Sequence, residues 1–252
     1  MGGAIARGLA ADPDFCTADI TVCSPNRHGE LDALKADFPE LNVDTDNAKA
    51  IDGTDVIVLA VKPWLVYDVM DPLSQHIEWE RQMLVSVAAG VTLSQLSDLS
   101  LCTPPAVFRV MPNTAIALRK SMTFICSSGA TAEQARTVTD LFSRLGSVMP
   151  IEEKQMGACM ALASCGIAYA MRYVRAASEG GVELGVKADL AKDIVLQTMQ
   201  GAAALLQASG CHPEEEIDKV TTPGGSTIKG LNAMEAHGFT TSVIEGLKAS
   251  AQ

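Results

Sequence analysis

The sequence lacks the groups of cysteine and histidine residues that hold a structural metal ion. Its seven cysteines are scattered, none stands in a Cys-x-x-Cys pair, and the four histidines form no ligand spacing with them. An odd, irregular set of cysteines also speaks against a disulfide framework. We therefore expect no metal site, and reduced, mostly buried thiols in a cytoplasmic protein.

Long basic runs and confident membrane spans are absent as well. The 19 Lys and Arg residues are dispersed and the formal net charge is −11, which argues against nucleic acid or an anionic membrane as a partner. No basic segment precedes an apolar one at the start, so no signal peptide is expected. Residues 155–171 are uncharged but interrupted by glycine and serine, and we interpret them as a buried helix.

Aromatic residues are scarce, at 4%, whereas 48% of the residues are hydrophobic. This composition is typical of a globular enzyme with a core rich in alanine, valine and leucine. A chain of 252 residues is long enough for one large domain or two smaller ones, each with its own core.

The first half alternates between strand-like and helix-like segments. Strands are expected at residues 20–23, 55–61, 83–87, 107–110, 122–126 and 148–151, and helices at residues 4–12, 29–37, 65–77, 92–98 and 131–145. The apolar run at 55–61 is typical of a strand buried on both faces. The alternation predicts an α/β fold with a doubly wound, mostly parallel sheet.

From about residue 152 the pattern becomes almost purely helical, with helices expected at residues 153–184, 188–208, 213–218 and 226–250. These helices carry apolar residues on more than one face, which we interpret as a dimer interface. We therefore predict a nucleotide-binding domain over residues 1–151 and an all-helical dimerisation and substrate domain over residues 152–252.

One segment of the second half combines a turn with the start of a helix. The Pro-Gly-Gly run at 223–225 does not continue a helix comfortably, whereas Ser226 and Thr227 commonly begin one. The apolar spacing from 227 to about 237 is helical, and Gly238 follows it. The backbone N–H groups and positive dipole end of such a helix suit a small carboxylate. An ordinary capped helix explains the same spacing.

This segment, Thr-Thr-Pro-Gly-Gly-Ser-Thr-Ile at 221–228 with Met-Glu at 234–235 and Gly-Phe at 238–239, resembles the C-terminal signature of the pyrroline-5-carboxylate reductase family. Three further motifs are similar to that family's cofactor-domain motifs, in the same order: Ala-Val-Lys-Pro at 60–63, Ser-Val-Ala-Ala-Gly-Val at 86–91 and Arg-Val-Met-Pro-Asn-Thr at 109–114. The resemblance runs from Met1 to about Ala249.

The resemblance implies a Rossmann-type domain and the reduction of 1-pyrroline-5-carboxylate to L-proline with NAD(P)H, the last step of proline biosynthesis. The cofactor delivers hydride to the imine carbon, while the protein aligns the two and excludes water. In this reading Thr227 hydrogen-bonds the imine nitrogen, and the backbone N–H groups of Gly225, Ser226 and Thr227 hold the substrate carboxylate. Glu153 matches a carboxylate near the substrate, although an acid that stabilises a helix start explains it equally well.

A Rossmann domain normally opens with a strand that leads into Gly-x-Gly-x-x-Gly. By the resemblance, Met1 and Gly2 correspond to the end of that loop and supply the helix-end half of a pyrophosphate site. We accordingly expect the first strand of the sheet and the first two loop glycines to be missing from this numbering.

Cofactor preference depends on the end of the next strand, where NAD sites usually place an acid on the ribose 2′-hydroxyl. This chain has no acid at that turn, and Ser24, Asn26 and Arg27 suit a 2′-phosphate. We predict NADPH as the preferred cofactor, with NAD as the second choice. Without the family context, an ordinary polar turn with a solvated arginine explains these residues as well.

The resemblance assigns further cofactor contacts to residues that follow strands. Asn47 matches a contact to the adenosine ribose, and Asn113 a polar contact near the nicotinamide. The segment of Ala60, Val61, Lys62 and Pro63 ends the predicted strand at 55–61, so its backbone is expected to border the cofactor. Lys62 suits a phosphate or a substrate charge, although a solvated lysine explains it as well. The segment of Val87, Ala88 and Ala89 matches the one against the nicotinamide, where small side chains leave room for a planar ring.

The chain departs from the family pattern in the expected substrate pocket. Ile167 stands in place of proline, Cys165 of serine, Met160 of threonine, Gly157 of aspartate and Lys219 of asparagine. These changes bear on the polarity of the pocket and not on the fold.

Two other function classes remain open. The β-hydroxyacid dehydrogenases share this architecture but need a lysine on the first long helix, and none follows Gly166 at that spacing. A non-catalytic NADP-binding or scaffold protein is the second alternative. In either enzyme reading the partners are a small-molecule substrate and further copies of the chain, as a homodimer or a higher homo-oligomer.

Overall fold

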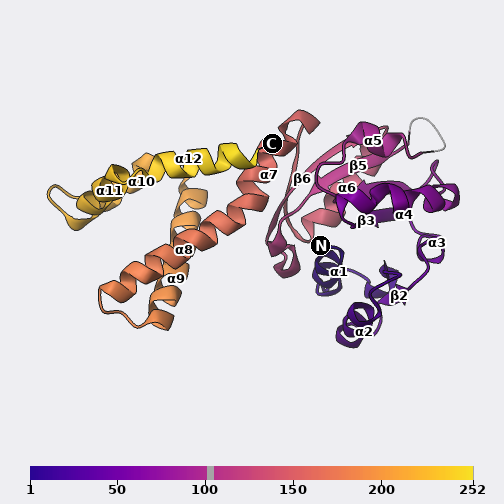
Figure 1. Cartoon of the computed structure of the whole chain (residues 1–252), viewed down its shortest axis with the longest axis horizontal. Coiled ribbons are helices and arrows are strands. Elements are labelled where there is room, and N and C mark those ends of the chain that lie inside the picture. Colours follow the sequence, from indigo (N-terminus) through magenta and orange to yellow (C-terminus); the bar gives the residue numbers. More distant parts are fainter. Residues whose placement is uncertain (101–104, 252) are drawn as a thin grey trace. The chain divides into compact units, whose positions relative to one another are not determined.

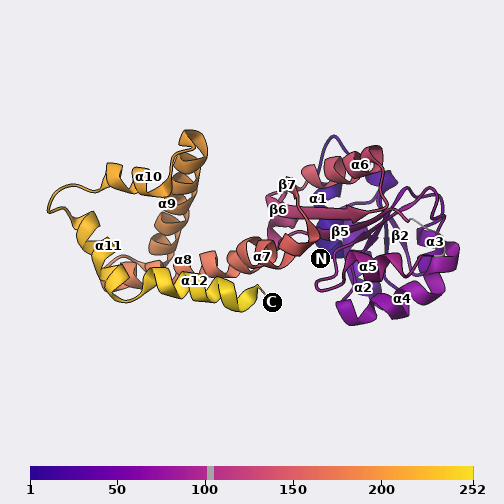
Figure 2. The same cartoon turned by 90° about the horizontal axis from the view of Figure 1, so that it is seen from above.

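The computed structural model describes residues 1–100 and 105–251. The chain divides into two compact units, Met1–Ser164 and Cys165–Gln252 (Figures 1 and 2). The domain boundary expected after residue 151 stays a prediction, and the compact units divide somewhat further along the chain.

A five-stranded sheet forms the centre of the first unit. Its strands follow in the order β3 (Val56–Leu59), β4 (Met83–Ser86), β5 (Val107–Met111), β6 (Ser121–Ser128) and β7 (Gly146–Pro150). The pairs β3–β4, β4–β5 and β6–β7 are parallel, and the pair β5–β6 is antiparallel. The prediction of a mostly parallel α/β sheet is confirmed.

A separate, parallel two-stranded sheet is made by β1 (Thr21–Cys23) and β2 (Asn42–Asp44). The sequence pattern predicts β1 but neither β2 nor helix α3 (Asn47–Ala50), because segments of three or four residues are too short to show a period. Within the described chain, β1 and β3 are each the edge of their own sheet.

Helix α1 (Gly2–Ala10) packs against both sheets. Its Ile5 and Leu9 share a core cluster with Val56 and Val58 of β3, whereas Ala6 packs in the cluster that includes β1. Val56 and Val58 remain only half-buried. The expectation of a strand buried on both faces is therefore wrong for β3, because it lies at the edge of the five-stranded sheet.

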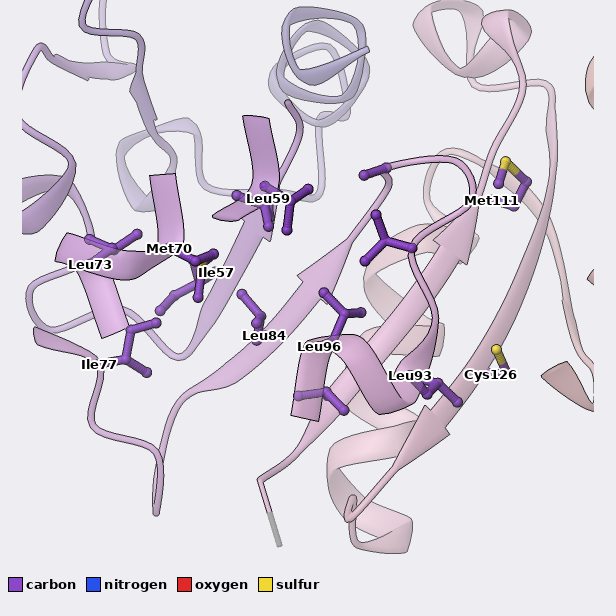
Figure 3. Packing of buried hydrophobic residues seen from close by; sticks show 14 of the residues in the cluster. Ile57, Leu59, Met70, Leu73, Ile77, Leu84, Leu93, Leu96, Met111 and Cys126 are labelled. Atoms are coloured by element: carbon purple, nitrogen blue, oxygen red, sulfur yellow. The ribbon is translucent and has the colours of Figure 1, made fainter. Parts of the chain in front are cut away.

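Helices cover both faces of the five-stranded sheet. On one face, Ile57 and Leu84 pack against Met70 of α4 (Val66–Leu73) and Leu96 of α5 (Leu93–Ser97), as Figure 3 shows. On the other face, Phe108 packs with α1 and with α6 (Ala132–Ser143). Each such buried side chain stabilises the fold by roughly 1.5–3 kcal/mol. Helix α2 (His28–Asp37) packs in the cluster of the two-stranded sheet.

Helical structure continues from the end of the sheet into the second unit. Helix α7 (Met156–Met160) and a π-helical turn (Ala161–Cys165) precede α8 (Gly166–Glu183), α9 (Ala188–Ser209), α10 (Pro213–Val220), α11 (Ser226–Ala236) and α12 (Phe239–Ser250). The single helix expected over 226–250 is divided, because Gly238 adopts a left-handed φ of 77° between α11 and α12.

The second unit has almost no core of its own. Among its described residues only Ala191 is buried, with 3% exposure. Large apolar side chains such as Met171, Leu184 and Leu205 are exposed. The interpretation of residues 155–171 as a buried helix is thus wrong for a single chain beyond Ala161, because residues 162–171 are each partly or fully exposed. The helical stretch Glu153–Glu183 is apolar and long enough to cross a membrane by length and composition alone, which is weak evidence for a span.

The described cysteines are free thiols, and Cys102 lies outside the described residues. The expectation of mostly buried thiols is wrong: of the described six, Cys126 is buried, Cys16 is exposed, and the others are partly exposed. The reason is that, of these six, Cys126 alone lies in the five-stranded sheet, in β6, whereas the other five lie outside that sheet.

Close packing of α1 gives a first testable prediction. A Cβ added at Gly8 would lie 2.8 Å from the carbonyl oxygen of Ile116 and 2.6 Å from Leu145 Cδ2, whereas one at Gly3 meets nothing within 4 Å. We expect Gly8→Ala to lower the free energy of unfolding by about 1–3 kcal/mol through overpacking. Gly3→Ala should leave it unchanged or raise it by up to about 1 kcal/mol. Urea unfolding measures both, and equal stability of the two variants would contradict the packing described.

A buried carboxylate just beyond the end of α1 joins three segments of the first unit. Asp12 has 4% exposure; its Oδ2 lies 2.9 Å from Arg144 NH1 and its Oδ1 lies 3.2 Å from Arg119 NH2. Arg119 holds a left-handed φ of 56° and donates from Nε to the carbonyl of Arg144. The Arg144 hydrogen bond, helped by the Asp14 N–H and the Arg119 charge, holds the pKa of Asp12 below its ordinary value against the opposing effect of burial.

The lowered pKa of Asp12 predicts an acid-sensitive contribution to stability. A depressed carboxyl pKa stabilises the fold above the unfolded-state pKa, and this stabilisation disappears as the pH falls through the folded-state value. Asp12→Asn should therefore lower the Tm at neutral pH, and its deficit against the unmodified chain should shrink below about pH 4. Asp140→Asn, on the exposed side of α6, is the control. A deficit that is the same at every pH would show that the charge of Asp12 does not matter.

Candidate active site

The carboxyl ends of β3, β4 and β5 lie side by side at one edge of the sheet. Leu59, Ser86 and Arg109 are paired across the three strands. The chain segments that leave these strands begin at Ala60, Val87 and Pro112, so the structure brings most of the expected cofactor residues of the first unit to this edge: Ala60, Val61, Lys62, Pro63, Val87, Ala88, Ala89 and Asn113. In open α/β sheets this edge is where ligands bind.

The start of α1 lies against the same edge. A Cβ added at Gly2 would lie 3.0 Å from Ala60 Cβ, so the first turn of α1 packs directly on the segment after β3. Met1 is the N-cap residue, no side chain caps the helix, and its first turn holds no acid. The N–H groups of this helix end are therefore suited to a phosphate group. These residues fit the helix-end half of a dinucleotide pyrophosphate site.

The turn after β3 carries an aromatic residue that the motif does not predict. Trp64 has 72% exposure, and Lys62 Nζ lies 5.9 Å from the centroid of its ring. The chain has a second tryptophan, Trp79, which is buried and donates to the carbonyl of Ser74. Trp64 is consequently the tryptophan that can report on a ligand at this edge. Its position directly after the Ala-Val-Lys-Pro motif is the signal by which it could have been found.

The turn after β1 carries the residues expected to bind a 2′-phosphate. Ser24 N donates to the carbonyl of Asp44 over 3.3 Å, and Arg27 NH1 lies 2.7 Å from Glu30 Oε1, with both partners exposed. Asn47 is the first residue of α3, next to Asp46, which caps that helix. Arg27 therefore already has an acidic partner, Glu30, one helical turn along the chain.

Two acids stand at the end of β2, beside this turn. The Asp44 carboxylate accepts from the N–H groups of Asp46 and Thr45, which lowers its pKa against the opposing effect of burial. Burial raises the pKa of the Cys23 thiol to about 11, with a further contribution from the charges of Asp44 and Asp46. Although β1 itself ends without an acid, Asp44 at the end of β2 and Asp46 just after it place negative charge beside this turn.

The side chain of Asn113 is enclosed. It has 6% exposure, its Oδ1 accepts from Ala115 N at 3.0 Å, and its Nδ2 donates to the carbonyl of Ala163 at 3.3 Å. Next to it, Ser164 Oγ donates to the carbonyl of Pro112 at 3.2 Å. The expected contact between Asn113 and the nicotinamide stays a prediction, and the amide already has partners on both sides.

Glu153 is similarly engaged. Its Oε1 accepts from Leu93 N, the first residue of α5, at 2.7 Å and lies 3.2 Å from Arg109 NH1. Arg109 has 12% side-chain exposure. Its Nε is the buried side-chain atom without a hydrogen-bond partner among the described residues. The expected substrate contact of Glu153 stays a prediction. Arg109 is a charged residue inside an apolar strand, and that pattern could have singled it out.

The charges of Glu153 and Arg109 also act on Cys126 in the neighbouring strand. Burial raises the pKa of the Cys126 thiol to about 11, the Glu153 carboxylate adds to this, and Arg109 opposes it. Cys126 Sγ lies 3.8 Å from the carbonyl of Arg109. This thiol therefore stays protonated at neutral pH and is a poor nucleophile.

The substrate signature lies in the second unit. Gly224 adopts a left-handed φ of 70°, and Gly225 N donates to the carbonyl of Thr222 at 2.9 Å, which closes the turn before α11. Gly225 is the N-cap of α11, with no side-chain cap and no acid in the first turn. Ser226 and Thr227 are exposed at the start of this helix. The turn and helix start predicted from the sequence are confirmed.

Of the departures from the family pattern, Lys219 has a clear partner. Its Nζ lies 2.6 Å from Glu216 Oε1 on the same face of α10, and this hydrogen bond raises the pKa of Lys219. Met160 packs against the core of the first unit. Cys165 ends the π turn and Ile167 lies in the first turn of α8.

Comparisons with known proteins agree with this geometry. Residues 153–252 match the family model described as pyrroline-5-carboxylate reductase dimerisation, and residues 1–90 match the one described as NADP oxidoreductase, coenzyme F420-dependent. Pyrroline-5-carboxylate reductase 2 of Dictyostelium discoideum is 35% identical, over 100% of this chain and 88% of its own length. Pyrroline-5-carboxylate reductase 1 of the same organism is also 35% identical, over 99% of this chain, which spans 47% of that longer protein.

A solved structure gives the same result. Pyrroline carboxylate reductase of Plasmodium falciparum with NADP bound has a TM-score of 0.88 and 25% identity, over 100% of this chain and 92% of that one. Sequence similarity over the full chain and structural similarity over both units therefore lead to one conclusion: the chain belongs to the pyrroline-5-carboxylate reductase family.

Proposed function

We propose that this chain transfers a hydride from NADPH to the imine carbon of 1-pyrroline-5-carboxylate and so forms L-proline. The observation that carries the proposal is the start of α11, where a closed Pro-Gly-Gly turn leaves an uncapped helix end beside two exposed hydroxyls. This feature lies in a chain that is 35% identical over its whole length to a pyrroline-5-carboxylate reductase.

The substrate carboxylate is held at the N-terminus of α11 in this proposal. Gly225 N already donates to Thr222 within the turn, so the N–H groups of Ser226 and Thr227 are the donors that remain. The positive end of the helix dipole adds to their attraction, and no acid in the first turn opposes it. Gly225 contributes the shape of the turn in place of a hydrogen bond.

Thr227 binds the imine nitrogen through its hydroxyl in this proposal. When bound, NADPH supplies the hydride from C4 of its nicotinamide. The imine carbon gains that hydride, the C=N double bond becomes a single bond, and the nitrogen carries a proton that it takes up from water. No strong general acid is required of the protein, and its task is alignment and the exclusion of water.

The cofactor binds along the carboxyl edge of the sheet in this proposal. The N–H groups at Met1 and Gly2 hold phosphate, the backbone at 60–63 borders the cofactor, and the small residues at 87–89 face the nicotinamide ring. Asn47 contacts the ribose. Ser24, Asn26 and Arg27 bind the 2′-phosphate, which makes NADPH the preferred form.

A homodimer completes the proposal. The helices of the second unit expose large apolar side chains on several faces and bury only Ala191 among their described residues. A second copy that covers these faces supplies the core that a single copy lacks.

The direct test is an assay of the purified chain with NADPH and 1-pyrroline-5-carboxylate. The proposal predicts one L-proline formed for each NADPH oxidised. The assay is also run on a chain that carries a strand and a Gly-x-Gly turn ahead of Met1, which measures what those groups add to cofactor binding. Binding of NADPH without product from either chain would favour the non-catalytic alternative.

Cofactor preference gives the first variant test. Because Arg27 is the basic residue at the turn after β1, Arg27→Ala should weaken NADPH binding by about tenfold, roughly 1.4 kcal/mol, and leave NADH binding unchanged. Glu30→Gln, which frees Arg27 from its partner, should strengthen NADPH binding. Quenching of Trp64 emission on titration with each nucleotide measures both. An equal loss for NADPH and NADH in Arg27→Ala would remove Arg27 from 2′-phosphate recognition.

The role of Thr227 gives the second variant test. Thr227→Ala removes the hydroxyl proposed to bind the imine nitrogen, so kcat should fall by about tenfold or more while the Kd for NADPH stays the same. Thr240→Ala on α12, whose hydroxyl donates to Glu235 Oε2 at 2.7 Å, is the matched control and should retain full turnover. Turnover of Thr227→Ala equal to that of the control would remove Thr227 from the mechanism.

A further inference from the structure

Two sets of interactions join β5 to residues 152–164, the segment that follows the sheet. In the first, Arg109 of β5 pairs with Glu153. In the second, the turn after β5 and the π-helical turn share two hydrogen bonds: Asn113 Nδ2 donates to the carbonyl of Ala163, and Ser164 Oγ donates to the carbonyl of Pro112. We call this second set, the two hydrogen bonds, the β5 clasp.

In the first set, the carboxylate of Glu153 joins its own segment to α5 and to β5. Glu153 Oε1 receives the Leu93 N–H at the start of α5 and the guanidinium of Arg109 in β5. Both interactions are partly buried, where a charge pair is screened less than on the surface. The chain is therefore held to the sheet and to α5 at Glu153, ahead of the start of α7 at Met156.

Apolar packing keeps the same segment in the core of the first unit. Met156 has 1% exposure, and Cys159, Met160 and Ala163 pack against the cluster formed by β3, β4, β5, α4 and α5. Although the dimerisation family model begins at residue 153, the compact first unit extends to Ser164. Residues 153–164 therefore pack as part of the first unit.

The clasp depends on the π-helical geometry at Ala161–Cys165. A π turn widens the helix and changes which backbone groups are paired within it, and such turns are frequent at functional sites. Here one residue of the turn offers a carbonyl and the next a hydroxyl to the same loop of β5. The loop itself is stiffened because Asn113 Oδ1 accepts from Ala115 N and Asn113 N donates to Ser121 Oγ.

We propose that Asn113 and Ser164 are positioning residues for hydride transfer: the β5 clasp fixes the loop at 112–114, which lies at the carboxyl edge where the nicotinamide end of the cofactor is expected. Asn113 has almost no exposed surface to offer a ligand, so its effect passes through the backbone of this loop. The inference rests on the proposed function. A displacement of about 1 Å at the reacting atoms lowers the rate by about 100-fold.

Two variants open the clasp from opposite sides. Ser164→Ala removes the hydroxyl that reaches Pro112, and Asn113→Asp keeps the acceptor for Ala115 but loses the donor to Ala163. We expect either variant to lower kcat by about 10–100-fold, with the Kd for NADPH unchanged. Ser164→Thr keeps the hydroxyl and should recover turnover. Ser143→Ala on α6, which also loses a hydroxyl that donates to a backbone carbonyl, is the matched control and should keep full turnover.

The experiment measures kcat, the Kd for NADPH and the Tm of each variant on the full chain. A fall in kcat in both clasp variants at unchanged Kd, with recovery in Ser164→Thr, supports the positioning role. A lower Tm with unchanged kcat of the folded enzyme shows a structural role alone and overturns the inference, while the proposed function stands. No turnover by the unmodified chain overturns the proposed function and the inference together.

Discussion

The parallel pairing of β3, β4 and β5 is the constraint on which the rest of the nucleotide-binding unit depends. It sets Leu59, Ser86 and Arg109 side by side, so the three segments that follow leave the sheet at one edge. Apolar layers on both faces hold this register, because a slip by one residue would turn each buried side chain toward the opposite face. The start of α1 then packs against Ala60 and brings its N–H groups to that edge.

Much of this arrangement could be predicted from the sequence, because it depends on local patterns. Apolar runs located β3, β4 and β5, and the Pro-Gly-Gly-Ser-Thr run located the start of α11. Other features depend on partners far apart in the chain: Glu153 reaches Arg109 and Leu93 only after folding, and Asn113 meets Ala163 only through the π turn. Strand β2 and helix α3 are too short to show a period.

In the helical unit, the sequence pattern does not distinguish residues buried within one copy from residues buried between copies. Its apolar residues predict cores or interfaces equally well, and in one copy only Ala191 of the described residues is buried. Helices in proteins gain most of their stability from tertiary contact, and these helices have little of it within one copy. In the proposed homodimer the second copy supplies that contact.

The central claim, that this chain delivers hydride to a cyclic imine, is tested most directly by isotope transfer. NADPH that carries deuterium at the transferred position of nicotinamide C4 is incubated with the chain and 1-pyrroline-5-carboxylate, and the product is examined by mass spectrometry and NMR. The account predicts L-proline with one deuterium, on the carbon that was the imine carbon. Oxidation of the nucleotide without deuterium in proline, or no oxidation at all, would contradict it.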